Sequence, residues 1–188
     1  MSTPSHSLIF LFLCLPAVLV RANVYRHIYP CPCKSSHENE TRLRMYLHQF
    51  PAWPSVPNRN EYGVINSSEP IGFGQMYVHD WFITTGPGAN ENVVGRLQGY
   101  HLQASQTSTT WYTAHTMVFR DGSFAGSTLE VSGILDKHDG RWSITGGTAA
   151  FGSAHGTIKF TESQSSTEII RELDIHVFHT PETVVSTH

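Results

Sequence analysis

Apolar and polar side chains alternate with a period of two along much of the chain from Gly72 onward. Leu129 and Val131 flank the polar Glu130, and residues 169–179 repeat the same alternation. A period of two places one set of side chains on a core face and the other towards water or a lumen. After the first 22 residues no stretch shows a sustained helical period, so the pattern predicts an all-β domain.

The alternating segments predict a series of consecutive strands joined by short turns. Asp121-Gly122 and Asp139-Gly140 are dipeptides that favour tight hairpin turns. Consecutive strands without helices predict an antiparallel meander, and closure into a barrel of about eight strands hides its edges and encloses one small ligand. A two-layer sandwich is the alternative that periodicity alone leaves open. The expected strands are 43–50, 62–66, 72–84, 93–105, 110–120, 124–135, 141–146, 153–163 and 168–179.

The N-terminus carries an apolar run, LIFLFLCLPAVLV at residues 8–20, which is too short to span a bilayer comfortably. It predicts a signal peptide at residues 1–22 that is cleaved after Ala22, with an uncleaved anchor as the alternative. Residues 23–42 are polar and predict a flexible arm, so the barrel domain is expected at residues 43–188. We therefore expect a secreted protein that has no membrane attachment after signal cleavage.

Two further features concern an exported chain. Asn39 and Asn66 each begin a tripeptide of the N-glycosylation type, and both are expected to lie on exposed segments. Cys31 and Cys33 are separated by one residue, which makes a bridge between them strained. Free thiols, an intermolecular bridge and a strained local bond all stay open.

Composition argues against several classes of function. The 188 residues suggest one domain, and a net charge of -3 without a Lys/Arg cluster argues against nucleic-acid binding. Gly146-Gly147 and Gly152 resemble a phosphate loop, but residues 157–160 after them are strand-like, whereas such a loop needs a following helix. The spacing of His and Cys matches no structural zinc site, so we expect neither a metal nor a cofactor.

Three segments in this order resemble the dirigent family of plant proteins. They are GFGQMYVHDWFITTGPGANENVVGRLQGYHLQAS at residues 72–105, MVFRDGSFAGSTLEVSG at 117–133 and RWSITGGTAAFGSAHG at 141–156. MYLHQF at residues 45–50 resembles a diverged form of the family's opening strand. The resemblance covers most of residues 43–180, and it is the combination and order of the segments that make it specific.

This resemblance implies an eight-stranded antiparallel β-barrel of the dirigent and allene-oxide-cyclase type, assembled as a homodimer or homotrimer and exported to the plant cell wall space, the apoplast. A separate laccase or peroxidase would supply phenoxy radicals from a monolignol such as coniferyl alcohol. The barrel would then orient two radicals so that coupling yields an optically active lignan. Orientation lowers the entropic cost of a productive encounter and needs no metal, nucleophile or redox group in the protein.

The resemblance also indicates pocket residues, several of which depart from the pattern of lignan-forming members. Those members carry an aspartate where this chain has Gln49, a tyrosine at His101 and an arginine at His155. We expect these three residues to bind substrate together with Tyr77, Asp80 and Asp136, the two aspartates having turn capping as an alternative role. Aromatic residues that suit stacking on a phenol are Phe73, Tyr77, Tyr100, Trp111, Phe119 and Phe151.

The departures leave other functions open. Without the arginine and the carboxylate, the pocket is expected to lack the permanent charge that would grip phenolic oxygens. A lyase or cyclase that acts on a phenolic or flavonoid alcohol would need a carboxylic acid as proton donor, and the loss of the opening-strand acid argues against it. A wall or stress protein that binds a phenolic compound without directing chemistry is the third hypothesis.

Overall fold

The structure is a computed structural model that describes residues 38–88, 90–135, 138–164 and 167–180. The predicted signal peptide, most of the predicted arm, both cysteines of the CPC triplet and Asp136 lie outside these residues. The described residues contain nine strands and three short 3-10 turns. The strands are β1 (Asn39–Gln49), β2 (Glu61–Ile65), β3 (Met76–Thr84), β4 (Val93–Gln103), β5 (Trp111–Phe119), β6 (Thr128–Ile134), β7 (Asp139–Thr148), β8 (His155–Gln164) and β9 (Ile169–His179).

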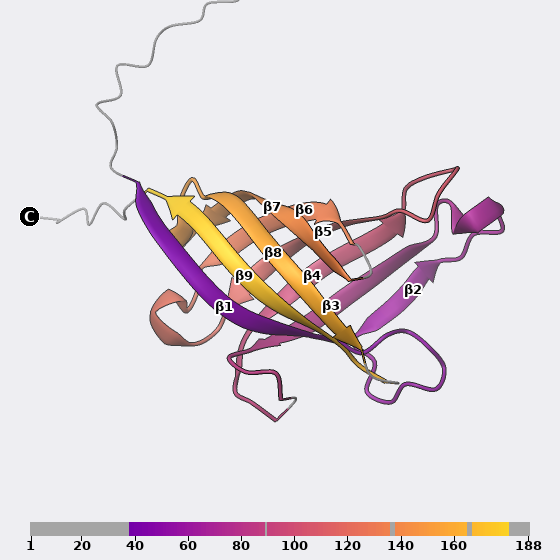
Figure 1. Cartoon of the computed structure of the whole chain (residues 1–188), viewed down its shortest axis with the longest axis horizontal. Helices are drawn as coiled ribbons and strands as arrows, with labels where there is room; N and C mark the ends of the chain where they lie inside the picture. Colours follow the sequence, from indigo (N-terminus) through magenta and orange to yellow (C-terminus); the bar gives the residue numbers. More distant parts are fainter. Residues whose placement is uncertain (1–37, 89, 136–137, 165–166, 181–188) are drawn as a thin grey trace, which may run out of the picture. The chain divides into compact units, whose positions relative to one another are not determined.

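Eight of these strands close into an antiparallel barrel in the order β1-β9-β8-β7-β6-β5-β4-β3, and β3 pairs with β1 again. Closure occurs where the end of β1 meets the end of β3, with Tyr46 opposite Thr84 and His48 opposite Phe82. Only the end of β3 pairs with β1. The short strand β2 pairs with the beginning of β3. In Figure 1, β1, β9 and β8 run side by side as curved neighbouring strands. This arrangement confirms the predicted barrel and excludes the two-layer sandwich.

Alternation decides which side chains face the interior. Leu129 and Val131 of β6 are buried whereas Glu130 between them is exposed, as the period of two predicts. In β9 the inward row is fully buried at Leu173, Ile175 and Val177. Inward-facing residues of each strand lie beside inward-facing residues of the next strand. The apolar side chains of the barrel strands therefore meet in one core.

Several predicted boundaries and turns differ from the structure. β1 begins at Asn39, within the segment expected to be a flexible arm, because its first residues pair with the end of β9. The predicted strands at 72–84 and 124–135 begin too early, since 3-10 turns occupy Pro70–Gly72 and Gly122–Phe124. Phe124 of the second turn packs against the core, so the apolar pattern alone does not distinguish this turn from the start of a strand.

The two Asp-Gly dipeptides do not form two-residue hairpin turns. Asp121 caps a 3-10 turn, and its carboxylate accepts a hydrogen bond from the backbone N–H of Gly122 at 2.7 Å. Asp139 and Gly140 already belong to β7, opposite β8. A Cβ at position 140 would lie 2.6 Å from the Phe160 ring, so the glycine leaves room for an aromatic side chain instead of bending a turn.

The two ends of the barrel interior differ in character. At one end Phe119, Phe124 and Phe151 pack on one another with ring centroids 4.7–6.0 Å apart and fill the space. Towards the other end the inward positions carry polar and ionisable side chains, among them Gln49 and Arg171, which are also buried. The polar end therefore offers hydrogen-bonding groups to a ligand, whereas aromatic rings fill the other end.

The outer face of β2, β3 and β4 carries an apolar strip formed by Tyr62, Val78 and Tyr100, which occupy paired positions on the three strands. Their exposed fractions are 57%, 40% and 37%. These side chains follow the outward phase of the alternation and do not contribute to the core. Within the described residues, no helix combines the length and the apolar character that crossing a membrane requires.

Candidate active site in the barrel mouth

A cavity of about 370 Å³ opens at the polar end of the barrel. Its walls come from β1, β3, β4, β5, β8 and β9 together with the loops that follow β1 and β6. A volume of this size is at the lower end of the range for small-molecule sites, and it suits a ligand built from one or two aromatic rings. The lining residues are Gln49, Trp53, Tyr77, His101, Trp111, Leu135, His138, Glu162, Ile169 and Arg171.

A chain of polar side chains crosses one wall of this cavity. The guanidinium of Arg171 donates to the Glu162 carboxylate at 2.6 Å and to the side-chain oxygen of Gln49 at 2.5 Å. The amide nitrogen of Gln49 donates in turn to the carboxyl group of Glu61 at 2.8 Å. Residues of β1, β2, β8 and β9 thus form one network, in which Gln49 links the guanidinium of Arg171 to the carboxyl group of Glu61.

Burial shapes the charges of this network. Burial raises the pKa of Glu61, against the opposing effect of hydrogen bonds from the Ala52 backbone, Gln49 and Trp81. Burial lowers the pKa of Arg171, while the neighbouring charges of Glu162 and Glu61 favour its protonated form. An arginine stays protonated in proteins, so the wall presents a positive charge that Glu162 directly compensates.

The opposite wall is aromatic. Tyr77 stacks on His101 with ring centroids 5.2 Å apart, and the edge of Trp111 meets His101 at 5.4 Å. The Tyr77 hydroxyl accepts a hydrogen bond from the Gln75 amide at 2.7 Å, which fixes the ring. Flat faces of this kind bind the planar ring of a phenol by stacking.

A cluster of buried histidines lies behind this aromatic wall. His79 contacts His101 through their Nδ1 atoms at 3.3 Å, and the ring of His115 meets His79 edge-on at 5.6 Å. Burial lowers the pKa of His79 to about 2, that of His115 to about 3 and that of His101 to about 4. All three rings are therefore neutral near neutral pH. Among the described residues no group of three or more His, Cys, Asp or Glu is arranged to hold a metal ion.

The structure brings together only some of the residues expected to bind substrate. Gln49, Tyr77 and His101 all line the cavity. Asp80 is instead on the outer face, where its carboxylate lies 3.4 Å from the Arg96 guanidinium. His155 is also on the outside, with a side chain that is 56% exposed and lies 3.7 Å from Glu38.

The period of two explains these two placements. Asp80 lies between the inward His79 and Trp81. His155 is the first residue of β8 and has the opposite phase to the buried Ile158 and Phe160. A motif match along the sequence does not fix which face of a strand a side chain takes. Asp136 lies outside the described residues, and the predicted glycosylation sites Asn39 and Asn66 both lie at exposed positions.

The aromatic candidates also divide among several environments. Tyr77 and Trp111 line the cavity, whereas Phe119 and Phe151 belong to the packed core at the closed end. Tyr100 points outward, and Phe73 lines a separate surface depression with Glu69 and Pro70.

The expectation that the pocket lacks permanent charge is wrong, because Arg171 and Glu162 supply it from the last two strands. A signal for Arg171 existed in the sequence: it shares the phase of Leu173 and Ile175, so it occupies an inward position where a charged residue needs a partner. Glu61 gave no such signal, because its strand is short and its partners come from distant segments.

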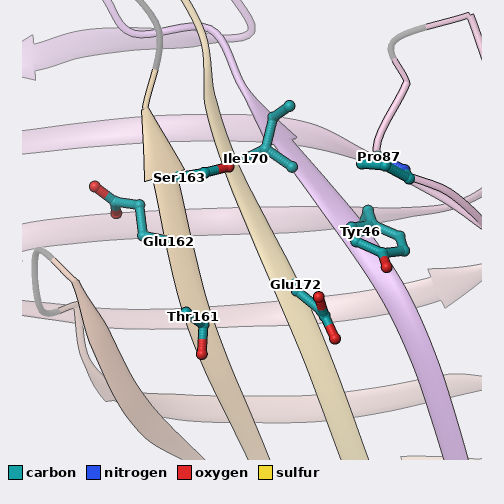
Figure 2. A pocket seen from close by; sticks show the side chains of 7 residues that line it. All are labelled: Tyr46, Pro87, Thr161, Glu162, Ser163, Ile170 and Glu172. Carbon is teal, nitrogen blue, oxygen red and sulfur yellow. The ribbon is translucent and has the colours of Figure 1, made fainter.

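A second, shallower depression lies on the outer face of β1, β8 and β9 and has a volume of about 270 Å³. Figure 2 shows Tyr46, Ile170 and Glu172 along its floor and Pro87 at its side. Glu172 is already engaged by Arg44 at 3.3 Å. Its mostly apolar, open surface offers a ligand fewer directed contacts than the cavity in the barrel mouth.

Comparisons with known proteins agree with this architecture. Residues 40–178 match the profile of the family described as Dirigent-like protein. Pterocarpan synthase 1 of Glycyrrhiza echinata is 32% identical over 186 residues, which cover 90% of this chain and 96% of that protein. Dirigent protein 15 of Arabidopsis thaliana is 28% identical over 190 residues, which cover 93% of this chain and 98% of that protein.

A solved structure shows the same relationship. That structure is of a pterocarpan synthase dirigent protein, and it superimposes with a TM-score of 0.70 at 30% identity, covering 85% of this chain and 99% of that one. Sequence and fold thus agree over the whole barrel. The chain belongs to the dirigent family.

Proposed function

We propose that this protein is a dirigent-type lyase that removes water from a phenolic alcohol of the flavonoid class and closes a ring. The relatives named pterocarpan synthase support this proposal at 32% and 29% identity. The observation that carries it is the Glu162–Arg171–Gln49 network facing an aromatic wall across one cavity. The argument against a lyase was the loss of the opening-strand acid, but Glu162 and Glu61 bring carboxyl groups into the same network from other strands.

The chemistry of such a dehydration fits the two walls. The bond between a benzylic carbon and its hydroxyl group breaks, and the carbon becomes electron-poor while a conjugated phenol oxygen carries the compensating charge. A second phenol oxygen then bonds to that carbon, and the reaction releases one molecule of water. One proton must reach the departing hydroxyl group, and one must leave the attacking phenol.

Arg171 is suited to the charge that develops on the phenol oxygen. Each terminal nitrogen of its guanidinium uses one N–H in the bonds to Gln49 and Glu162, and each has a second N–H. A preorganised donor in a water-poor site stabilises charge more strongly than water does, because it needs no reorganisation during the reaction. Glu162 and Gln49 hold the guanidinium in place.

Guidance of phenoxy-radical coupling towards an optically active lignan is the second candidate function. Similarity to dirigent proteins of Arabidopsis thaliana favours it, and the aromatic wall of Tyr77 and Trp111 suits a monolignol such as coniferyl alcohol. A barrier difference of about 1.4 kcal/mol between two coupling faces gives about a tenfold preference for one product. In this function a separate laccase or peroxidase would generate the radicals outside the cell.

One paired assay separates the two functions. The protein is incubated without oxidant with an isoflavanol that carries a phenol group placed to close the pterocarpan ring, and product is followed by chromatography. In parallel it is incubated with coniferyl alcohol and a one-electron oxidant, followed by chiral analysis. Ring closure in the first reaction supports the lyase, whereas an unchanged isoflavanol together with an enantiomeric excess in the second replaces it with the guide function.

Arg171→Met tests the assignment of the charged wall. Loss of one preorganised donor to a developing charge lowers turnover by about a hundredfold or more. Arg96→Met removes an arginine on the outer face and is the matched control, for which turnover stays unchanged. Equal turnover in the Arg171→Met variant and the wild type would contradict the role of this residue.

A further inference from the structure

The histidines behind the aromatic wall have no role in the charged network. His101 lines the cavity, whereas His79 and His115 are buried behind it with exposed fractions of 5% and 4%. The Nε2 atoms of both buried rings have no hydrogen-bond partner among the described residues. Buried polar atoms are seldom left unpaired, so this arrangement calls for an explanation other than stability.

The contact between His79 and His101 constrains where their protons lie. Their Nδ1 atoms are 3.3 Å apart, so one of the two must carry the hydrogen and the other must accept it. If His101 Nδ1 donates, its Nε2 is left with a free lone pair for a ligand in the cavity. If His79 Nδ1 donates, His101 Nε2 carries a hydrogen and is unable to accept a proton.

The tautomer of His115 can be assigned from its neighbour. The Thr113 hydroxyl donates to the backbone carbonyl of Tyr100 at 3.1 Å, so it accepts from His115 Nδ1 at 3.1 Å. His115 Nε2 is therefore an unpaired lone pair beside His79. The proton of the His79–His101 contact is not fixed by His115, and only donation by His101 Nδ1 leaves a lone pair on the ring that lines the cavity.

We propose that His101 is a proton shuttle in the dehydration and that His79 is the positioning residue that holds it in the Nδ1–H tautomer. This inference rests on the proposed lyase function and assigns its proton transfers. His101 Nε2 takes the proton of the attacking phenol and gives it to the departing hydroxyl group. The carbon–hydroxyl bond breaks, the ether bond forms, water leaves, and His101 returns to its neutral form.

The surroundings of His101 suit a proton that is held only briefly. When Nε2 is protonated, Nδ1–H continues to donate to His79, so the ring needs no rearrangement. The buried position and the charge of Arg171 lower the pKa of His101 to about 4, which makes its protonated form a strong proton donor to the departing hydroxyl. The titratable groups that face it are Tyr77, His79, His115, His138, Glu162 and Arg171.

Nuclear magnetic resonance tests the tautomer without relying on activity. In the ¹⁵N-labelled full chain, two-bond ¹⁵N–¹H correlations distinguish a protonated from an unprotonated ring nitrogen. We expect hydrogen on Nδ1 and none on Nε2 of His101 in the wild type, and loss of this preference in His79→Leu. Hydrogen on Nε2 of His101 in the wild type would overturn the proposal.

Kinetics with the isoflavanol probe test the shuttle itself. We expect His101→Gln to lower kcat by about a hundredfold or more, and His79→Leu to lower it by about tenfold to a hundredfold with KM changed less than about threefold. His79→Gln restores most of the loss, because its side-chain oxygen accepts from His101 Nδ1. His176→Gln changes a histidine that pairs with Glu40 outside the barrel, and its kinetics should match the wild type.

The outcomes separate this inference from the proposed function. An active wild type with an equally active His101→Gln variant overturns the shuttle and leaves the lyase standing. Equal effects of His79→Leu and His79→Gln overturn the positioning role, since only the glutamine offers an acceptor. If the wild type leaves the isoflavanol unchanged, both the lyase and the shuttle are overturned. The tautomer measurement then still tests whether His79 holds the hydrogen of His101 on Nδ1.

Discussion

The three buried histidines predict that acid weakens the fold of this protein. Burial lowers the pKa of His115 to about 3, whereas an unfolded histidine titrates near 6.5. A lowered folded pKa means that protons bind the unfolded chain more readily. The contribution of His115 to stability is therefore complete above about pH 6.5 and is lost progressively as pH falls towards 3.

The size of this effect follows from proton linkage. With a folded pKa of about 3 and an unfolded value near 6.5, His115 loses about 2 kcal/mol of stabilisation between about pH 7 and about pH 5. His79 and His101 have folded pKa values of about 2 and about 4, so each loses about the same amount in this window. Glu61 acts oppositely, because its raised pKa adds stability as pH falls. The total loss is therefore at most about 6 kcal/mol, which is a large part of the stability of a typical domain.

His115→Phe removes the contribution of one of the three histidines to the pH dependence of the unfolding free energy. Phenylalanine keeps a planar ring in the site and does not titrate. Urea unfolding at about pH 7 and about pH 5 gives the loss of unfolding free energy for each protein, and the loss in the variant should be smaller by about 2 kcal/mol. Packing changes cancel in this double difference because they are present at both values of pH.

An exposed histidine provides the control for the acid measurement. His176 lies on the outer face of β9 and pairs with Glu40, so His176→Gln should leave the loss between the two pH values close to that of the wild type. The reasoning is refuted if His115→Phe and the wild type lose the same free energy on acidification.

Three further predictions concern stability and assembly. Ala149 has a φ of 52°, a value that favours glycine, so Ala149→Gly should raise the melting temperature. Gly126 has a φ of 84°, so Gly126→Ala should lower it. Equal shifts in the melting temperature of the two variants would contradict the assigned strain. Arg171→Met leaves the carboxylate of Glu162 buried without its partner and should cost about 3–5 kcal/mol in urea unfolding, and a loss below about 1 kcal/mol would show that the pair is dispensable. We expect the outer apolar strip to bind a second copy of this chain, and Tyr100→Glu places a charge in it. Sedimentation of the variant should therefore show a smaller assembly than the wild type. Identical sedimentation profiles would rule out this surface as the interface.

Local pattern was sufficient to predict much of the fold. The alternation of side chains predicted the nine strands of the described residues and the inward rows of β6 and β9. Turn chemistry was less informative, because Asp121-Gly122 and Asp139-Gly140 have the same composition but occupy a 3-10 turn and a strand. Gly122 adopts a positive φ of 73° in its turn, whereas Gly140 lies in a strand where the ring of Phe160 leaves no room for a Cβ.

Sequence reasoning placed some residues of the candidate site correctly and others on the wrong face of a strand. Motif position along the chain identified Gln49, Tyr77 and His101, which meet in one cavity because all three occupy inward positions. The same reasoning placed His155 in the pocket, but it lies on the outer face of β8. A shift of one residue reverses the face of a strand, so a match of motif is not yet a match of orientation.

The sequence by itself determined the strand periodicity and the resemblance to the family, whereas the closure of the sheet was established only when the structure showed β1 pairing with β3. Only the tertiary structure decided which charges meet inside the barrel, since Arg171 and Gln49 are separated by 122 residues and become neighbours when β9 pairs with β1. The pairing of His79 with His101 likewise depends on the register between β3 and β4. Local propensity acts over a few residues, whereas barrel closure brings distant strands into one low-dielectric interior, where burial and neighbouring charges set the chemistry of each side chain.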